Sequence, residues 1–532
     1  MPIQSQSAAI QTLQDALAKH SAGRIPEALQ IYTSVASQLQ HLGQFWHFYG
    51  LALFQAGDTA KATDCFRRAL LLIPNDANCI NRFACIFLAE HHPESAHRQL
   101  RHALAITPDH PEAWRNIAET ERLDGNPAAA LQSLEKAMTL CPNEAYKASQ
   151  AVLSYRKSLL LAPSSPQALN NLQLAERRIG RMQDAVRNAS RACLIEPENI
   201  GLQHGLTDAL LSAGEIERGH ARNFWRHLKP EILIIRHGLP KEWDGAPCRD
   251  GAGLLVCHEQ GIGDELRFVS CIPDIQKRFN GPVFLESDKR LLPLFARSFP
   301  DVTVIEKIQR SETVPSTAQY APLIGAHGIG QYMMLADMQS FVRPSLQSFP
   351  SHAGYLKPDV SEVRRWKNSF RAHGERPAVG FSWRSGMRRA GARHNYPELA
   401  DIAPFFKAAD FLPVCLQYDV SASEIAAIQT LTDQQLDIPP GIDQKDELDR
   451  VAAMIAALDL VISPNTSVLM MAGAVGTPSI GLHSQCGAIF FGAGADPWFP
   501  IECSLVKTGD RAWPALIDEA VPHLVRILSE YR

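Results

Sequence analysis

The feature that most constrains this chain is a 34-residue spacing of prolines within its first 230 residues. Pro74, Pro108 and Pro142 are 34 residues apart, and so are Pro163 and Pro197. Alanine recurs twelve and five residues before four of these prolines, at Ala62, Ala96, Ala130 and Ala185 and at Ala69, Ala103, Ala137 and Ala192. A fixed period of this length, with small residues where two helices cross, predicts helix pairs that stack and bury their core between neighbours.

The repeating unit resembles the tetratricopeptide repeat, and its clearest copy runs from Gly43 to Pro74. Glycine stands seventeen residues before three of the prolines, and His91 takes that position in one unit. The interval from Pro142 to Pro163 is only 21 residues, so we expect a first helix to be missing and the array to be irregular there. Arrays of this kind present a concave groove to a peptide or protein.

Composition and length limit the number of domains, the kind of partner and the cellular compartment that can be expected. A chain of 532 residues is too long for one compact core, so several domains are expected. The formal charge of −4 gives no argument for a nucleic-acid partner. Eleven cysteines without metal-binding spacing favour a reducing compartment. No secretory signal or membrane-spanning run is visible, so we expect a soluble, cytoplasmic protein without membrane insertion.

After residue 230 the pattern changes to alternating strands and helices. Strands are predicted at 253–257, 283–286, 302–305, 378–383, 411–417, 436–439, 460–462 and 479–482, with helices at 291–299 and 514–531. This alternation predicts parallel sheets covered by helices. The expected domains are an all-α repeat array over 1–230 and two α/β halves over 231–375 and 376–532.

Three stretches at strand ends are candidates for ligand binding. The turn Ser463-Pro464-Asn465-Thr466-Ser467 opens a helix, where backbone N–H groups and the helix dipole favour a phosphate, although an ordinary helix cap has the same pattern. The pair Gly261-x-Gly263 follows the strand at 253–257 and is weak evidence alone. A loop after Trp383 carries four arginines, including Arg384 and Arg393, and arginine suits phosphate oxygens.

Residues 458–478 resemble the donor-binding segment of bacterial glycosyltransferases of the heptosyltransferase and O-GlcNAc-transferase-like type, whose pattern is LDLVISxDTxxxHLAGALGxP. Asn465 replaces the usual Asp and Met470 the usual His. The stretch LLVCHEQGIGDELRFVSCIP resembles the EQGxGDxxxF motif of the same family, and WDGAP and ADPWFP match its flanking segments. With the repeats, the chain resembles tetratricopeptide-fused transferases that modify flagellin.

The resemblance implies a GT-B arrangement of two Rossmann-like domains and an inverting, metal-independent transfer. Asp264 would be the general base, with Glu265 and His258 as rivals that spacing does not separate. The implied donor-site residues are Gly261, Gly263, Trp383, Arg384, Arg393, Gln417, Ser463, Asn465, Thr466, Ser467 and His483. Asn116 and Asn171, at one repeat position, would hold the acceptor peptide.

The implied donor is a nucleotide-diphosphate sugar or a CMP-nonulosonic acid, used as a co-substrate with no further cofactor. The implied acceptor is a protein, flagellin in the narrower resemblance. A second hypothesis is a scaffold or chaperone whose transferase half has lost activity, which Asn465 and Met470 favour. Asp264, the glycine pair and the arginine loop favour the enzyme.

Overall fold

The computed structural model divides the chain into two compact units. They are Met1–Pro142 with Leu153–Pro163, and Asn143–Val152 with Ser164–Arg532. The described residues are 12–530 except 14, 18, 21–23, 141–144, 230–233, 312–315, 351–352, 386–394, 485–486, 500, 502 and 508–510. The division falls at the short interval between Pro142 and Pro163, where the 34-residue period breaks.

The first unit consists of helical hairpins. Its helices are α2 (Ile25–Leu39), α3 (Gly43–Gln55), α4 (Thr59–Leu72), α5 (Ala77–Ala89), α6 (Pro93–Ile106), α7 (Pro111–Leu123), α8 (Pro127–Leu140) and part of α9 (Ala145–Leu161). A single helix, α9, occupies the shortened interval, where a full repeat would have two. The repeat alanines are buried, among them Ala62, Ala69, Ala96 and Ala103 at 0 % exposure. The predicted helical repeats are confirmed.

The hairpin turns explain the glycine position of the repeat. Gly57 and Gly125 have φ of 87° and 74°, a left-handed backbone that glycine adopts without strain. His91 occupies the equivalent turn between α5 and α6 with φ of 59°. The turn therefore keeps its geometry where glycine is absent, and His91 adopts a left-handed backbone conformation that is unfavourable for a residue with a side chain.

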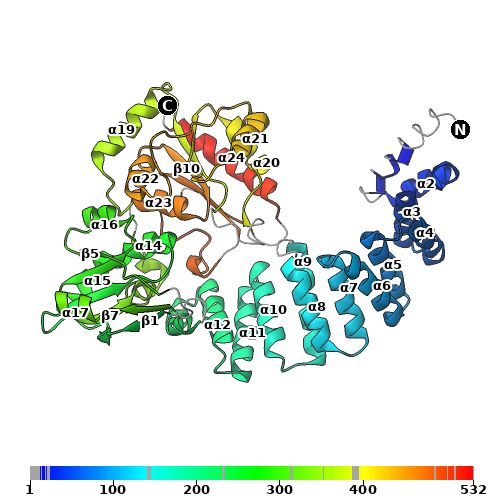
Figure 1. Cartoon of the computed structure of the whole chain (residues 1–532), viewed down its shortest axis with the longest axis horizontal. Helices are drawn as coiled ribbons and strands as arrows, with labels where there is room; N and C mark the ends of the chain where they lie inside the picture. Colours follow the sequence, from blue (N-terminus) through cyan, green and yellow to red (C-terminus); the bar gives the residue numbers. More distant parts are fainter. Residues whose placement is uncertain are drawn as a thin grey trace. The chain divides into compact units, whose positions relative to one another are not determined.

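The second unit begins with the last repeats. They are α10 (Pro166–Arg178), α11 (Met182–Ile195), α12 (Ile200–Ser212), α13 (Ile216–His220) and the 3-10 helix η1 (Asn223–Leu228). Helices α10, α11 and α12 lie side by side (Figure 1). A two-stranded parallel sheet of β1 (Ile234–His237) and β6 (Ser316–Gln319) follows them.

The first α/β lobe (residues 234–350) is built on a five-stranded parallel sheet in the order β2-β7-β3-β4-β5. Its strands are β2 (Lys241–Glu242), β3 (Gly253–Cys257), β4 (Val283–Ser287), β5 (Thr303–Glu306) and β7 (Ile329–Met334). Its helices are α14 (Ile262–Phe268), η2 (Val269–Cys271), α15 (Ile272–Phe279), α16 (Leu292–Ser298), α17 (Ala321–His327), η3 (Leu335–Asp337), α18 (Met338–Val342) and η4 (Leu346–Ser348).

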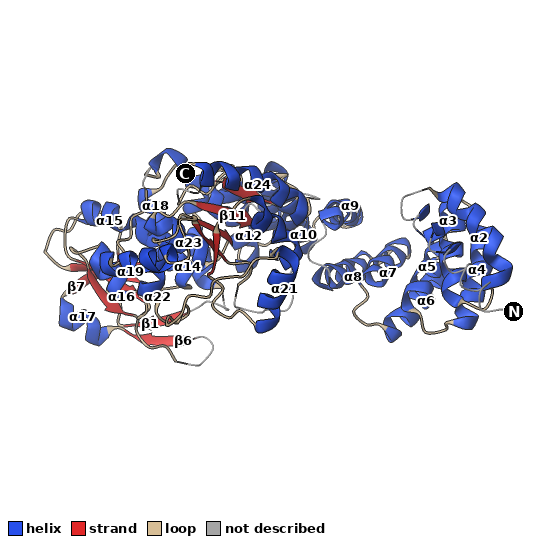
Figure 2. Ribbon diagram, turned by 90° about the horizontal axis from the view of Figure 1, so that it is seen from above, coloured by secondary structure: helices blue, strands red, loops and turns tan. Residues whose placement is uncertain are grey.

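The second lobe (residues 360–530) has a parallel sheet in the order β12-β11-β10-β8-β9. Its strands are β8 (Ala378–Phe381), β9 (Leu412–Cys415), β10 (Leu460–Pro464), β11 (Ser479–His483) and β12 (Cys503–Val506). Its helices are α19 (Val360–Arg371), α20 (Leu399–Ala408), α21 (Ala422–Thr432), α22 (Leu448–Ile455), α23 (Ser467–Val475), η6 (Ala488–Phe490) and α24 (Trp513–Ser529). Figure 2 shows helices around the strands of both sheets.

The predicted parallel α/β architecture is confirmed, with differences in detail. The strand expected at 436–439 is only an isolated bridge between Val414 and Asp437. Strands β1, β2, β6, β7 and β12 were not predicted. Among the described residues, no helix is both long and apolar enough to cross a membrane.

One loop, residues 487–499, connects three parts of the second unit. Its Phe491 packs edge-on against His220 at the end of the repeats, and its Trp498 packs against Phe268 of the first lobe. Within it, Asp496 accepts hydrogen bonds from the Arg267 guanidinium at 3.1 and 3.2 Å, and both side chains are 1 % exposed. This loop joins the two lobes through a fully buried ion pair and an aromatic cluster.

Candidate functional site

The two lobes meet where α14 and α23 begin. A Cβ built on Gly263 would lie 2.6 Å from the Met470 sulfur and 4.0 Å from the Ser467 Cα. A side chain at position 263 would require the Met470 side chain to move. The glycine pair of the first lobe and the 463–467 turn of the second lobe, predicted as separate motifs, are therefore neighbours.

The second-lobe cavity lies at the start of α23 and has a volume of about 110 Å³. Its lining includes five predicted donor-site residues, Arg384, Gln417, Asn465, Thr466 and Ser467. Thr466 is the N-cap of α23 without a side-chain hydrogen bond to the helix, and its hydroxyl lies 3.1 Å from that of the buried Ser463. The first N–H groups of α23 therefore have no side-chain cap, which suits an anion of phosphate size.

Arg384 is engaged by carboxylates of its own lobe. Its Nε and Nη2 donate to the two Glu424 oxygens at 2.8 and 2.9 Å, and its Nη1 donates to Asp419 at 2.7 Å. The Arg384 hydrogen bonds are the main cause that holds the pKa of Glu424 well below its usual range. Arg384 therefore lines the cavity with its charge compensated. The other predicted arginine, Arg393, lies outside the described residues.

Gln417 lines this cavity, and Trp383 lies directly before its lining residue Arg384 in the chain. The buried Gln417 carbonyl oxygen accepts from the Trp383 and Arg384 N–H groups at 3.3 and 3.2 Å. The Trp383 indole donates to Glu424 at 3.1 Å. Both predicted residues fix the backbone after β8 instead of presenting free polar groups.

Asp264 lies half-buried in the first turn of α14, one residue from the contact with α23. Burial raises the pKa of its carboxyl, and Arg267 opposes that shift. Glu259, which lines a second, larger cavity described below, and Arg226 are further charged groups that act on Asp264 through space. A carboxylate with a raised pKa is a better proton acceptor than an ordinary aspartate.

His258 and Glu265 are bound to each other behind this turn. Glu265 is 1 % exposed and accepts from His258 Nε2 at 2.9 Å, from the Ser287 hydroxyl at 2.6 Å and from the Asp288 N–H at 3.1 Å. His258 Nδ1 accepts from Arg310 at 2.7 Å. Because every polar atom of the two side chains has a partner, they position the loop, and Asp264 is the more accessible of the three candidate bases.

His483 differs from its expected position in the crevice. It is 1 % exposed, packs edge-on against Phe490, and does not line the second-lobe cavity. Neither ring nitrogen has a hydrogen-bond partner among the described residues. Burial lowers its pKa to about 4, so the ring is neutral at neutral pH.

The two candidate acceptor asparagines fall in different compact units. Asn116 donates to the Asn81 side chain at 2.9 Å, and Asn171 accepts from Gln167 at 3.2 Å. Each amide is thus held within its own group of repeats.

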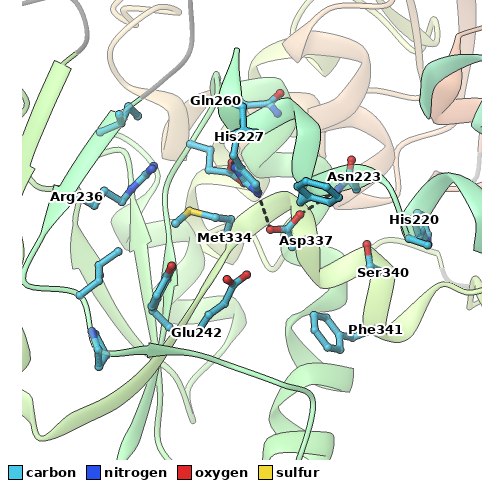
Figure 3. A pocket seen from close by; sticks show the side chains of 18 residues that line it. His220, Asn223, His227, Arg236, Glu242, Gln260, Met334, Asp337, Ser340 and Phe341 are labelled. Atoms are coloured by element: carbon cyan, nitrogen blue, oxygen red, sulfur yellow. Dashed lines mark hydrogen bonds and ion pairs between the residues drawn. The ribbon is translucent and has the colours of Figure 1, made fainter. Parts of the chain in front are cut away.

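A larger cavity, about 680 Å³, was not predicted (Figure 3). It lies between the end of the repeats and the first lobe, and Glu259 and Gln260 of the glycine-pair loop line it. We call it the junction cavity. Phe224, 54 % exposed, and Leu228, 43 % exposed, are also among its lining residues. Its walls come from four stretches of the chain, residues 220–228, 234–242, 259–260 and 332–341, so no single local pattern marks it.

A buried ion network closes one wall of the junction cavity. Arg226 of η1 donates to Glu259 at 2.5 Å and to Asp337 at 2.7 Å, and His227 Nε2 lies 2.8 Å from Asp337 (Figure 3). Burial opposes ionisation of Asp337, but Arg226 and His227 outweigh it and hold its pKa at about 2. The network fixes the last turn of the repeats to the glycine-pair loop.

Comparison with known proteins identifies the repeats. Residues 43–76 and 81–145 each match a tetratricopeptide-repeat family model. Over 495 residues the chain is 27 % identical to Protein FlbA of Caulobacter vibrioides, covering 88 % of this chain and 82 % of that protein. The tetratricopeptide repeats predicted from the sequence are confirmed.

Solved structures similar to this chain include three helical proteins or complexes. A MamA structure is 15 % identical with a TM-score of 0.24, covering 36 % of this chain and 92 % of its own. The Cut9–Hcn1 tetramer of the APC/C is 14 % identical with a TM-score of 0.27, covering 38 % and 43 %. Pseudomonas aeruginosa pilF is 14 % identical with a TM-score of 0.27, covering 37 % and 97 %.

Proposed function

We propose that this chain is an inverting, metal-independent glycosyltransferase of the GT-B type. It would move a sugar from a nucleotide-activated donor to a protein hydroxyl. The observation that carries the proposal is the contact of Gly263 with Ser467 and Met470, which brings Asp264 of one lobe next to the uncapped helix start of the other. A base and a phosphate site on facing lobes are what such a transfer requires.

In this mechanism the acceptor oxygen attacks the anomeric carbon as its proton passes to Asp264. The bond from that carbon to the donor phosphate breaks, and the electron pair leaves with the phosphate oxygen. The N–H groups at the start of α23 and the hydroxyls of Thr466 and Ser467 stabilise the charge that develops there. The acidic proton remains on Asp264 until solvent removes it.

The donor in this proposal is a nucleotide-diphosphate sugar or a CMP-nonulosonic acid, and the reaction takes place in the cytoplasm. The acceptor is a protein recruited by the repeats, with flagellin as the first candidate. Tetratricopeptide repeats generally mediate protein–protein interaction, which supports a protein acceptor. The small second-lobe cavity suits the donor phosphate, whereas the larger junction cavity has room for part of an acceptor.

One observation favours the alternative of an inactive scaffold. The Arg384 charge is already compensated by Glu424 and Asp419, so the described lining of the second-lobe cavity offers little free positive charge to a diphosphate. A scaffold would use the repeats alone.

Two measurements decide between these functions. Thermal-shift screening of the full chain should find one nucleotide that stabilises it, by about 2.7 kcal/mol at 100 times its Kd. Thr466→Val and Ser467→Ala should weaken the binding of that nucleotide. Intact-mass analysis of a co-expressed acceptor should show a sugar increment, formed about 10²–10⁴ times more slowly with Asp264→Asn.

The matched control is Asp301→Asn, an exposed carboxylate of the same lobe. Asp264→Asn should keep the nucleotide shift, because its role is in the transfer step. A chain that no nucleotide stabilises, and that leaves every acceptor unmodified, is the scaffold.

A further inference from the structure

We propose that Arg236 and Arg310 form a binding site for one anionic group, a carboxylate or phosphate, beside the junction cavity. Arg236 projects from β1 and lines this cavity (Figure 3). Arg310 follows β5. The inference does not depend on the proposed transferase activity, because it rests on this pair of guanidinium groups and their surroundings.

Both arginines converge on one backbone carbonyl. Arg236 Nη2 donates to the His258 carbonyl oxygen at 2.9 Å, and Arg310 Nη2 donates to the same oxygen at 3.1 Å. Arg310 also donates to His258 Nδ1 at 2.7 Å. Two cations therefore share a single neutral acceptor at the end of β3, directly before the glycine-pair loop.

Neither guanidinium has a carboxylate partner among the described residues. The nearest candidates have partners of their own. Glu286 accepts from the His258 and Ile308 N–H groups at 2.8 and 2.7 Å and from the Tyr320 hydroxyl. Glu286 is thus saturated and cannot turn toward the pair without breaking buried hydrogen bonds.

Glu259 is likewise held, by Arg226 at 2.5 Å and by the Ala336 N–H at 3.0 Å. Glu242 lines the same cavity but is exposed and forms no hydrogen bond or ion pair with either arginine. The Arg236 Nε is buried and has no hydrogen-bond partner among the described residues. Donor capacity therefore remains at this position, and Glu286 and Glu259 act on Arg310 through space without a hydrogen bond to it.

Two like charges in a partly buried place repel each other, and this repulsion adds to burial in lowering the pKa of Arg310. An anion between them would remove the repulsion and accept from both planar forks, which match carboxylate and phosphate oxygens. A cavity of about 680 Å³ is much larger than one such group. The anion is therefore part of a larger molecule, either an acidic side chain of a bound protein or the acidic group of a sugar.

Inorganic phosphate is the first probe, titrated calorimetrically into the full chain at constant ionic strength. We expect saturable binding that weakens at least tenfold in Arg236→Gln and in Arg310→Gln. Arg249→Gln, which changes an exposed arginine of the same lobe, should bind phosphate as the wild type does. Because Arg310 also holds His258, Arg310→Lys serves as a second variant, and it should retain the fold and bind with intermediate affinity.

Competition against phosphate then identifies the source. N-acetylneuraminic acid that displaces phosphate indicates a sugar acid, and an aspartate-containing hexapeptide that displaces it indicates a protein side chain. Phosphate binding that is equal in wild type and Arg236→Gln belongs to another site, such as the start of α23, and overturns the proposal. So does an absence of saturable binding. Neither result bears on nucleotide stabilisation, which tests the proposed function separately.

Discussion

Gly263 and Met470 are in contact across the two lobes, with 2.6 Å between the Met470 sulfur and the place of a Cβ on Gly263. We expect this contact to limit how closely α14 and α23 approach each other. Since Asp264 follows Gly263 directly, the same contact determines how far the carboxylate lies from the start of α23. Met470, which stands where the glycosyltransferase pattern that this stretch resembles has a histidine, thus borders the place where we propose the chemistry.

Gly263→Ala should therefore push the lobes apart. We expect a loss of about 1–3 kcal/mol in the free energy of unfolding, as for other overpacked cores, and weaker nucleotide binding. Met470→Ala in the same chain should recover most of both losses, because it removes the atoms that clash. Gly325→Ala in α17 is the control, since a Cβ there has nothing within 4 Å. Additive effects of the two changes would show that the contact does not set the spacing.

Glu259→Gln should destabilise the second unit by about 3–5 kcal/mol, because it leaves Arg226 with a buried, partly unpaired charge. Arg226 is bound to both Glu259 and Asp337, and the Arg226 side chain is 7 % exposed. Chemical denaturation followed by tryptophan fluorescence measures the change. Glu242→Gln, an exposed carboxylate of the same cavity, is the control. Equal stability of the two variants would contradict a structural role for the network.

The sequence predicted the features that repeat or recur locally. The period of prolines and alanines predicted the helix pairs, because each repeat position has one packing role. Short apolar runs predicted the strands β3, β4, β8 and β10. The turn at 463–467 was predicted to open a helix and does so at α23. Only the family resemblance placed Gly263 and Ser467 in one site, and no local pattern in either stretch predicts their contact.

Other features depended on tertiary contacts and left no local pattern. Arg384 lies in an arginine-rich stretch of the sequence. Its charge is compensated by Glu424 and Asp419, which are 40 and 35 residues away in the chain. The Arg236–Arg310 pair joins residues that are 74 apart in the sequence. The junction cavity also joins separate stretches of the chain. His483 looked like a crevice residue because it ends a strand, yet it is buried against Phe490.

Acid should destabilise the second unit through two buried histidines. Burial lowers the pKa of His220 and of His483 from 6.5 to about 4. The unfolded chain takes up these protons below about pH 6.5, whereas the folded chain does so only near pH 4. The stabilising contribution is therefore complete above pH 6.5 and is lost as the pH falls toward 4, by about 3 kcal/mol for each histidine.

Denaturation at pH 7.5, 6.0 and 4.5 measures this dependence. His483→Phe keeps a buried aromatic ring that does not titrate, so its stability should fall less steeply with acid than that of the wild type. His523→Gln, which changes an exposed histidine of α24, should leave the slope unchanged. An identical slope in His483→Phe would mean that His483 takes up its proton as readily in the folded chain as in the unfolded one.

The turn between α5 and α6 offers a gain in stability. His91 is exposed and has φ of 59°, a left-handed conformation that costs an L-residue about 1–2 kcal/mol. His91→Gly removes that cost. The greater conformational freedom of glycine in the unfolded chain offsets part of the benefit, so we expect the free energy of unfolding to rise by about 0.5–1 kcal/mol.

The equivalent turn provides the reciprocal test. A Cβ on Gly57 would meet nothing within 4 Å, so Gly57→His introduces only backbone strain and should cost about as much as His91→Gly gains. Amide hydrogen exchange in α5 and α6 for the first variant, and in α3 and α4 for the second, reports these local changes without requiring the whole chain to unfold in one step. Slower exchange in His91→Gly and faster exchange in Gly57→His are expected. Unchanged exchange in both would mean that the sign of φ in these turns does not limit the stability of the repeats.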